Sequence, residues 1–304
     1  MIISASRRTD IPSLHTKWFL NRLKEEYLIT QNPISKNNFY KIPLNKNIVD
    51  IIVFWSKNPN IDFLKEVRDL GYKFYLHFTI TPYDKNIERN IPNKKLLIRN
   101  FQTISKLFGK EKIIWRYDPI ILNDDFNANY HINNFKNFAD SLNGYTDECI
   151  FSFVQIYSKI KNNIKNINDN DKIILIENIK EISEKNNIKL KSCSQDFDKI
   201  TNIRVEKSAC IDKERIQKIL GYSIKEKKDK SQRKLCNCIE SIDIGMYNTC
   251  TNGCIYCYAN SKNILKDYDA NNEILSDKNL IDNENINITE RKIIINEKND
   301  VFKL

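Results

Sequence analysis

Apolar runs of strand length, alternating with helix-like stretches, constrain the fold of this chain most strongly. The strand candidates are Met1–Ser4, Ile51–Trp55, Lys73–Thr81, Lys112–Tyr117, Cys149–Ile156 and Ile188–Ser192. Stretches with helical spacing of apolar residues separate them: Ile11–Tyr27, Ile61–Leu70, Asn93–Phe108, His131–Leu142 and Asp171–Asn186. Strands joined by helices favour parallel pairing with right-handed crossovers. The pattern therefore predicts an α/β fold, a partial or full TIM-like (β/α) barrel, with its body in residues 1–235.

One more strand candidate, Glu240–Met246, comes late in the chain and leads directly into a cysteine-rich stretch. We expect it to lie beside Met1–Ser4, as in a circularly permuted barrel whose first strand stands near the C-terminus. Residues 236–268 would complete the barrel with this strand, a cysteine loop and a helix over Tyr258–Tyr268. Residues 269–304 are rich in Asn, Asp, Lys and Glu, and we expect an irregular polar tail with a short strand at Lys292–Ile295.

The cysteine loop reads Cys250-Thr-Asn-Gly-Cys254-Ile-Tyr-Cys257. Three thiolates at this spacing can each bind one iron of a [4Fe-4S] cubane, which leaves the fourth iron open for chemistry. Gly253 permits a tight turn between the first two ligands. A structural zinc site or a ferredoxin-like loop is the alternative, and zinc would require a fourth ligand from a neighbouring segment.

The chain has eight cysteines, and five of them fall between Cys236 and Cys257. This density indicates metal or redox chemistry rather than disulfides in a cytosolic chain. A second set could bind an auxiliary iron–sulfur cluster or zinc, and its members are Cys193, Cys210, Cys236 and Cys238. Cys193 and Cys210 could instead be small buried residues of the core.

Charged and hydroxyl side chains follow the carboxyl ends of several predicted strands, where parallel barrels carry their chemistry. The predicted catalytic residues are Arg8, Asp10, Lys57, Arg116 and Asp118, and the predicted cofactor-binding residues are Ser4, Ser6, Arg7, Arg8, Lys57 and Tyr256. Cations gathered at the carboxyl ends of the strands would suit the binding of carboxylates and phosphates. The alternative is that Arg8–Asp10 and Arg116–Asp118 are structural ion pairs.

The cysteine spacing together with Tyr256 resembles the radical S-adenosylmethionine (SAM) superfamily. Four longer blocks, Ser-Arg-Arg-Thr-Asp, Phe-Trp-Ser-Lys-Asn-Pro, Trp-Arg-Tyr-Asp-Pro and the cysteine loop, resemble the domain of unknown function 1848 family over residues 1–260. That family is similar to spore photoproduct lyase. The resemblance implies a [4Fe-4S] cluster on Cys250, Cys254 and Cys257, with SAM chelated at the open iron and cleaved to a 5′-deoxyadenosyl radical. The late cluster motif departs from the lyase, so DNA repair does not carry over.

These observations favour a lyase-like radical SAM enzyme that acts on an unidentified small molecule, anionic or nucleotide-like, and receives electrons from an external donor. Two alternatives stay open: a zinc-stapled nucleic-acid-binding protein and a two-cluster electron-transfer protein. The net charge of +10 permits a nucleic acid partner without requiring one. We expect a cytoplasmic protein without a membrane partner, because no apolar run is long enough to span a bilayer and the first residues do not resemble a signal peptide.

Overall fold

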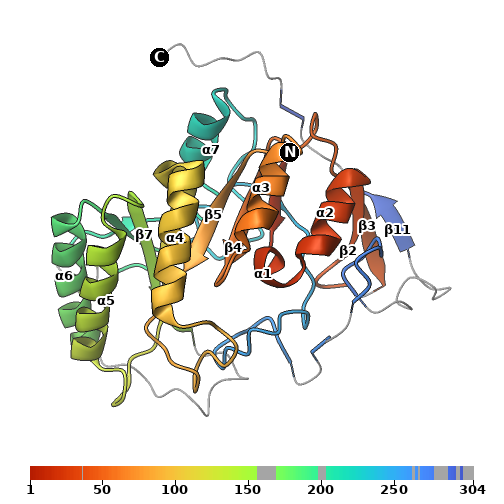
Figure 1. The fold of residues 1–304 in the computed structure, drawn as a ribbon. Helices are drawn as coiled ribbons and strands as arrows, with labels where there is room; N and C mark the ends of the chain where they lie inside the picture. The colour runs from red at the N-terminus through yellow and green to blue at the C-terminus, as the bar shows by residue number, and fades with distance from the viewer. Residues whose placement is uncertain are drawn as a thin grey trace.

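In a computed structural model the described residues are 1–35, 37–155, 169–197, 203–261, 264–265, 268–276, 287–291 and 295–296. They contain an eight-stranded parallel sheet in the order β10-β1-β4-β5-β6-β7-β8-β9, and Figure 1 labels β4, β5 and β7 of it. Its strands are β1 (Ile2–Ala5), β4 (Ile51–Ser56), β5 (Phe74–Thr79), β6 (Ile113–Ile120), β7 (Glu148–Phe153), β8 (Lys189–Ser192), β9 (Glu206–Lys207) and β10 (Ile242–Asp243). The predicted α/β class and the predicted strands from Met1 to Ser192 are confirmed.

The late strand lies where the sequence predicts it, although it is shorter. Residues Ile242 and Asp243 pair in parallel with Ile3 and Ser4 of β1, so a segment near the C-terminus supplies one edge of the sheet. The sequence predicts a partial or full TIM-like barrel; the sheet is open, so a full barrel is not formed. Among the described residues β9 and β10 are its two edges, each only two residues long, and they do not pair with each other. The alternation of strands and helices predicts parallel pairing but is the same for open and closed sheets.

Alternation of side chains along the strands divides the core into two parts. On β4, Ile52 and Phe54 belong to the larger core, while Ile51 and Val53 belong to the smaller one. The larger core packs against α2 (Thr16–Lys24), α3 (Ile61–Asp69), α4 (Lys94–Phe108), α5 (Ala128–Leu142) and α6 (Asp169–Lys185). The smaller core contains α7 (Lys213–Leu220) and four cysteines. The second face of the sheet is therefore covered by the segment that connects β9 to β10.

Asparagine and aspartate side chains begin several helices by accepting a hydrogen bond from a backbone N–H of the first turn. Asp10 caps α1 (Ile11–Leu14), Asn60 caps α3 and Asn93 caps α4. The predicted helix Ile11–Tyr27 is divided at His15, which separates α1 from α2. A short 3-10 helix, η1 (Lys110–Lys112), precedes β6.

The C-terminal region differs from the prediction in two respects. The described residues between 258 and 268 are not helical, because their polar groups bond to loops: the Asn260 amide donates to Cys250 O and the Ser261 N–H to the Asn248 side chain. Beyond them, Ile274 and Leu275 are buried in the larger core. A second sheet joins β2 (Tyr27–Gln31), β3 (Asn38–Pro43) and β11 (Asn287–Glu290). The expected strand at Lys292–Ile295 lies mostly outside the described residues.

Candidate functional site

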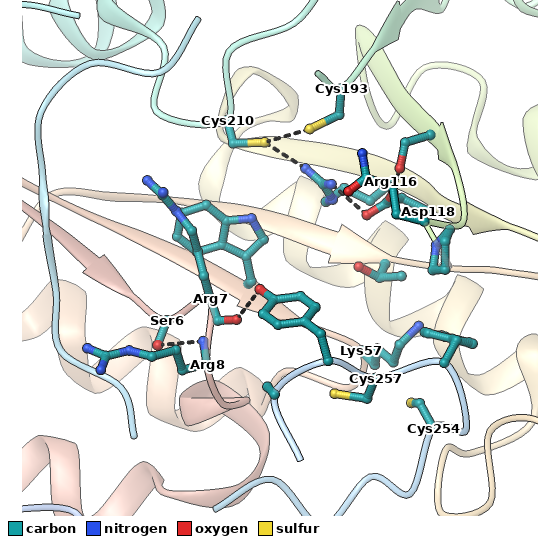
Figure 2. A pocket seen from close by; sticks show the side chains of 18 of the residues that line it. Ser6, Arg7, Arg8, Lys57, Arg116, Asp118, Cys193, Cys210, Cys254 and Cys257 are labelled. Carbon is teal, nitrogen blue, oxygen red and sulfur yellow. Dashed lines mark hydrogen bonds and ion pairs between the residues drawn. The ribbon is translucent and has the colours of Figure 1, made fainter. Parts of the chain in front are cut away.

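Loops at the carboxyl ends of β1, β4, β5, β6, β7, β8 and β10 surround a cavity of about 310 Å³. This edge is where parallel sheets usually bind their ligands. The cavity is lined by all the predicted site residues except Ser4, and also by Gln232 and Arg233. Figure 2 shows Cys254 and Cys257 on one side and Cys193 and Cys210 on the other, with Arg7 and Arg116 between them. The two cysteine sets therefore belong to opposite walls of one cavity.

Contacts with the loop after β5 hold the loop that carries Cys250, Cys254 and Cys257. The Asn90 side chain donates to Thr251 O at 2.6 Å, and the Ile255 N–H donates to Ile87 O at 3.0 Å. Gly253 has a φ of +70°, and a Cβ there would lie 3.2 Å from Cβ of Arg89. Glycine is therefore required both by the left-handed backbone and by the close packing.

The three thiols of this loop are close enough to influence one another electrostatically. Burial raises the pKa of Cys250, and the neighbouring Cys257 and Cys254 raise it further. Burial also raises the pKa of Cys254, to about 11, although the ammonium of Lys57 opposes this shift. Metal binding would have to displace these protons, as it does at thiolate sites generally. Three soft donors on one cavity wall fit an iron–sulfur cluster chemically.

Asp243, at the end of β10, organises the loop after β1. Its carboxylate accepts hydrogen bonds from the hydroxyls of Ser4 and Ser6, both at 2.8 Å, and from the Arg7 N–H at 2.9 Å. Nε of Arg8 forms a partly buried ion pair with the same carboxylate at 2.9 Å. Arg8 therefore pairs with Asp243 and not with Asp10. Burial opposes the charge of Asp243, but Arg8 and the other donors keep its pKa below the usual value.

Asp10 joins three segments around the cavity. Besides capping α1, its carboxylate accepts from the Lys57 N–H and from the Asn252 side chain, each at 2.9 Å. Asn252 belongs to the cysteine loop, so Asp10 connects the ends of β1 and β4 to that loop. Burial raises the pKa of Asp10. These contacts give it a positioning role.

Glu88 is a buried carboxylate that the sequence analysis did not identify. It accepts hydrogen bonds from Nζ of Lys57 at 2.7 Å, Nζ of Lys94 at 2.6 Å and the Thr81 hydroxyl at 2.6 Å. The Tyr256 hydroxyl of the cysteine loop also donates to it. Burial alone would raise the pKa of Glu88, but the two ammonium groups lower it to about 2. Glu88 therefore stays charged and ties Lys57 and Tyr256 together at the cavity.

Arg116 and Asp118 on β6 form an ion pair, the alternative to the catalytic role predicted for them, with Nη2 of Arg116 at 2.6 Å from the Asp118 carboxylate. Asp118 also accepts from the hydroxyl of Ser152, and Nη1 of Arg116 donates to Sγ of Cys210 at 2.9 Å. The guanidinium of Arg7 lies over the Trp55 ring, 5.7 Å from its centroid. Nε of Arg7 and the Thr9 hydroxyl are buried at the cavity without a hydrogen-bond partner among the described residues. Polar groups left in this way fit a ligand that carries acceptor oxygens.

The second cysteine set is buried on the opposite wall. Sγ of Cys193 lies 3.7 Å from Sγ of Cys210, and the Cys210 N–H donates to Sγ of Cys238 at 3.2 Å. Cys236 contacts Cys238, which lowers the pKa of the Cys236 thiol to about 6. Across the described residues, no set of three or more His, Cys, Asp or Glu side chains is already arranged to hold a metal ion. The described residues likewise include no helix able to cross a membrane.

Fold and site together define an α/β protein with an open parallel sheet and a cysteine-lined cavity at its carboxyl edge. The chain belongs to the family described as Domain of unknown function (DUF1848), whose model matches residues 2–259. The matched range contains all eight cysteines and the whole cavity lining. No curated protein and no solved structure matches the chain significantly.

Proposed function

We propose that this protein is a radical SAM enzyme that binds a [4Fe-4S] cluster through Cys250, Cys254 and Cys257. The observation that carries the proposal is the position of these three cysteines, which line one cavity with Arg7, Lys57 and Arg116 at the carboxyl edge of the parallel sheet. Cys193 and Cys210 lie on the opposite wall with their sulfurs in contact (Figure 2), and the Cys210 N–H donates to Sγ of Cys238. Three ligands with no fourth from that wall would suit a cluster with one open iron.

When bound and reduced, the cluster with SAM would supply the radical that begins the reaction. The chain's own residues would bind and orient SAM and substrate. Nε of Arg7 is buried and has no partner within the part of the chain that the structure describes, so Arg7 is the cation best placed to bind a carboxylate or phosphate. Lys57 and Arg8 are already paired with Glu88 and Asp243, so they would fix the loops and shape the electrostatic field.

The cations that line the cavity support an anionic or nucleotide-like substrate. Arg7, Arg116 and Arg233 all contribute to its wall. Arg116 is neutralised in part by Asp118 at 2.6 Å, whereas Arg7 stacks on Trp55. An aromatic ring beside a guanidinium offers both a flat surface and a positive charge, which suits a base or a similar planar anion.

Anaerobic purification with iron and sulfide analysis tests the cluster. We expect about four irons and four sulfides per chain, and an electron paramagnetic resonance signal of the reduced protein that changes when SAM is added. Cys254→Ala should lose the iron and the signal. Cys149→Ala is the matched control, because Cys149 is buried in the core on β7 and does not line the cavity. A Cys254→Ala protein that keeps the full iron content would contradict the proposal.

A further inference from the structure

The four cysteines on the wall opposite the proposed cluster have no part in the function proposed above. Cys193 directly follows β8, Cys210 precedes α7, and Cys236 and Cys238 lie between α7 and β10. They come from three separate segments, yet all are buried and belong to the same small core. Packing alone does not require four thiols at one point, because alanine or valine would fill such space equally well.

The sulfur positions indicate the kind of metal that this group could take. In a tetrahedral site with metal–sulfur bonds of about 2.3 Å, neighbouring sulfurs lie about 3.8 Å apart. Sγ of Cys193 and Sγ of Cys210 lie 3.7 Å apart. A [4Fe-4S] cluster binds each thiolate to a different iron, so its ligand sulfurs are spread more widely. The spacing of this pair therefore fits a single ion better than a cluster.

We propose that Cys193, Cys210, Cys236 and Cys238 form a tetrahedral site for one zinc ion. Binding would exchange four thiol protons for one Zn²⁺, which leaves the Zn(S-Cys)₄ unit with a charge of about −2. Side-chain contacts join Cys193 to Cys210, Cys210 to Cys238 and Cys238 to Cys236. The four sulfurs would have to move from this linear arrangement into a tetrahedron to bind the ion.

Hydrogen-bond donors around these sulfurs fit a negatively charged centre. Nη1 of Arg116 donates to Sγ of Cys210 at 2.9 Å. The N–H groups of Cys210 and Ile211 point at Sγ of Cys238, at 3.2 and 3.4 Å. Donors of this kind stabilise metal-bound thiolates and orient them. A zinc ion here would fasten the segment before α7 and residues 236–238 to the end of β8, and so fix one wall of the cavity with Arg116.

Metal analysis of the full-length protein, grown with zinc and purified anaerobically, tests the site. We expect about one zinc per chain in the wild type and in a variant with Cys250, Cys254 and Cys257 all changed to Ala. Zinc bound to this triple variant would support the zinc site even if the proposed iron–sulfur function failed. Cys236→Ser combined with Cys238→Ser should lose the zinc, whereas Cys149→Ser should keep it.

Cobalt substitution of the wild-type protein gives a second readout that needs no variant. A tetrathiolate site should show the strong visible absorption of tetrahedral cobalt with sulfur ligands, and zinc should displace the cobalt. Wild-type protein that binds neither zinc nor cobalt would overturn the proposal. So would iron and sulfide at these cysteines, or a Cys193–Cys210 disulfide found by mass spectrometry in metal-free protein.

Discussion

Glu88 offers the sharpest test of how the cavity is held together. Glu88→Gln preserves shape and removes the charge that pairs with Lys57 and Lys94, whose side chains are only 13% and 20% exposed. The pKa of Glu88 is about 2 against an ordinary value of 4.5. At about 1.36 kcal/mol for each pKa unit, the difference of about 2.5 corresponds to roughly 3 kcal/mol. This agrees with the ~3–5 kcal/mol that breaking a buried ion pair usually costs.

Urea unfolding of the wild type and Glu88→Gln at pH 7, with reductant present and both proteins prepared alike, measures the stability that this charge contributes. We expect Glu88→Gln to lower the free energy of unfolding by about 3 kcal/mol. Glu184→Gln is the matched control, because Glu184 pairs with Lys180 on the exposed surface of α6, and its loss should cost about 0.5 kcal/mol or less. If Glu88→Gln cost no more than the control, the carboxylate would not hold the lysines and the cysteine loop in place.

Three further predictions follow from the same structure. Asp243→Asn should cost about 3 kcal/mol in urea unfolding, because it removes the carboxylate that neutralises the buried Arg8 guanidinium, whereas Asp62→Asn on the surface of α3 should have little effect; equal effects of the two substitutions would refute the role of Asp243 as the partner of Arg8. Gly253→Ala should cost about 1–2 kcal/mol and lower the iron content, since its φ is +70° and its Cβ would meet Arg89; unchanged stability and iron would argue against the strained turn. His131 is buried and its pKa is lowered by burial to about 4, so the folded protein binds fewer protons than the unfolded chain and stability falls as the pH drops from about 6.5 towards 4. When the pH is lowered from 7 to 4.5, the free energy of unfolding of His131→Gln should therefore fall by about 2.5 kcal/mol less than that of the wild type. Equal decreases for the two proteins in urea unfolding would contradict this prediction.

The sequence allowed the large sheet and most of the cavity to be predicted, because both depend on local patterns. Apolar runs such as Ile51–Trp55 mark buried strands, and polar residues directly after them mark the carboxyl edge. Asp243 was missed although it follows the same rule, since its strand is only two residues long. The sequence groups Cys193, Cys210, Cys236 and Cys238 as a second set, and only the structure shows that this set lines the same cavity as the cysteine loop.

Other features depend on contacts between segments distant in the sequence, which no local pattern predicts. Glu88 lies in a polar loop after β5, and nothing in that loop marks it as the partner of Lys57 and Tyr256. The open sheet, the hairpin of β2 and β3 and the pairing of β11 with β3 also depend on which edges meet in space. The predicted helix at Tyr258–Tyr268 is absent from the described residues, where the Asn260 amide bonds to Cys250 and the Ser261 N–H to Asn248 instead.

The measurement that tests the central claim most directly is product analysis after reduction of the anaerobic, cluster-loaded protein with SAM. We expect 5′-deoxyadenosine to accumulate with the wild type and with Cys149→Ala. None should form with Cys250→Ala, Cys254→Ala or Cys257→Ala. Wild-type protein with a full complement of iron and sulfide that leaves SAM intact would contradict the account.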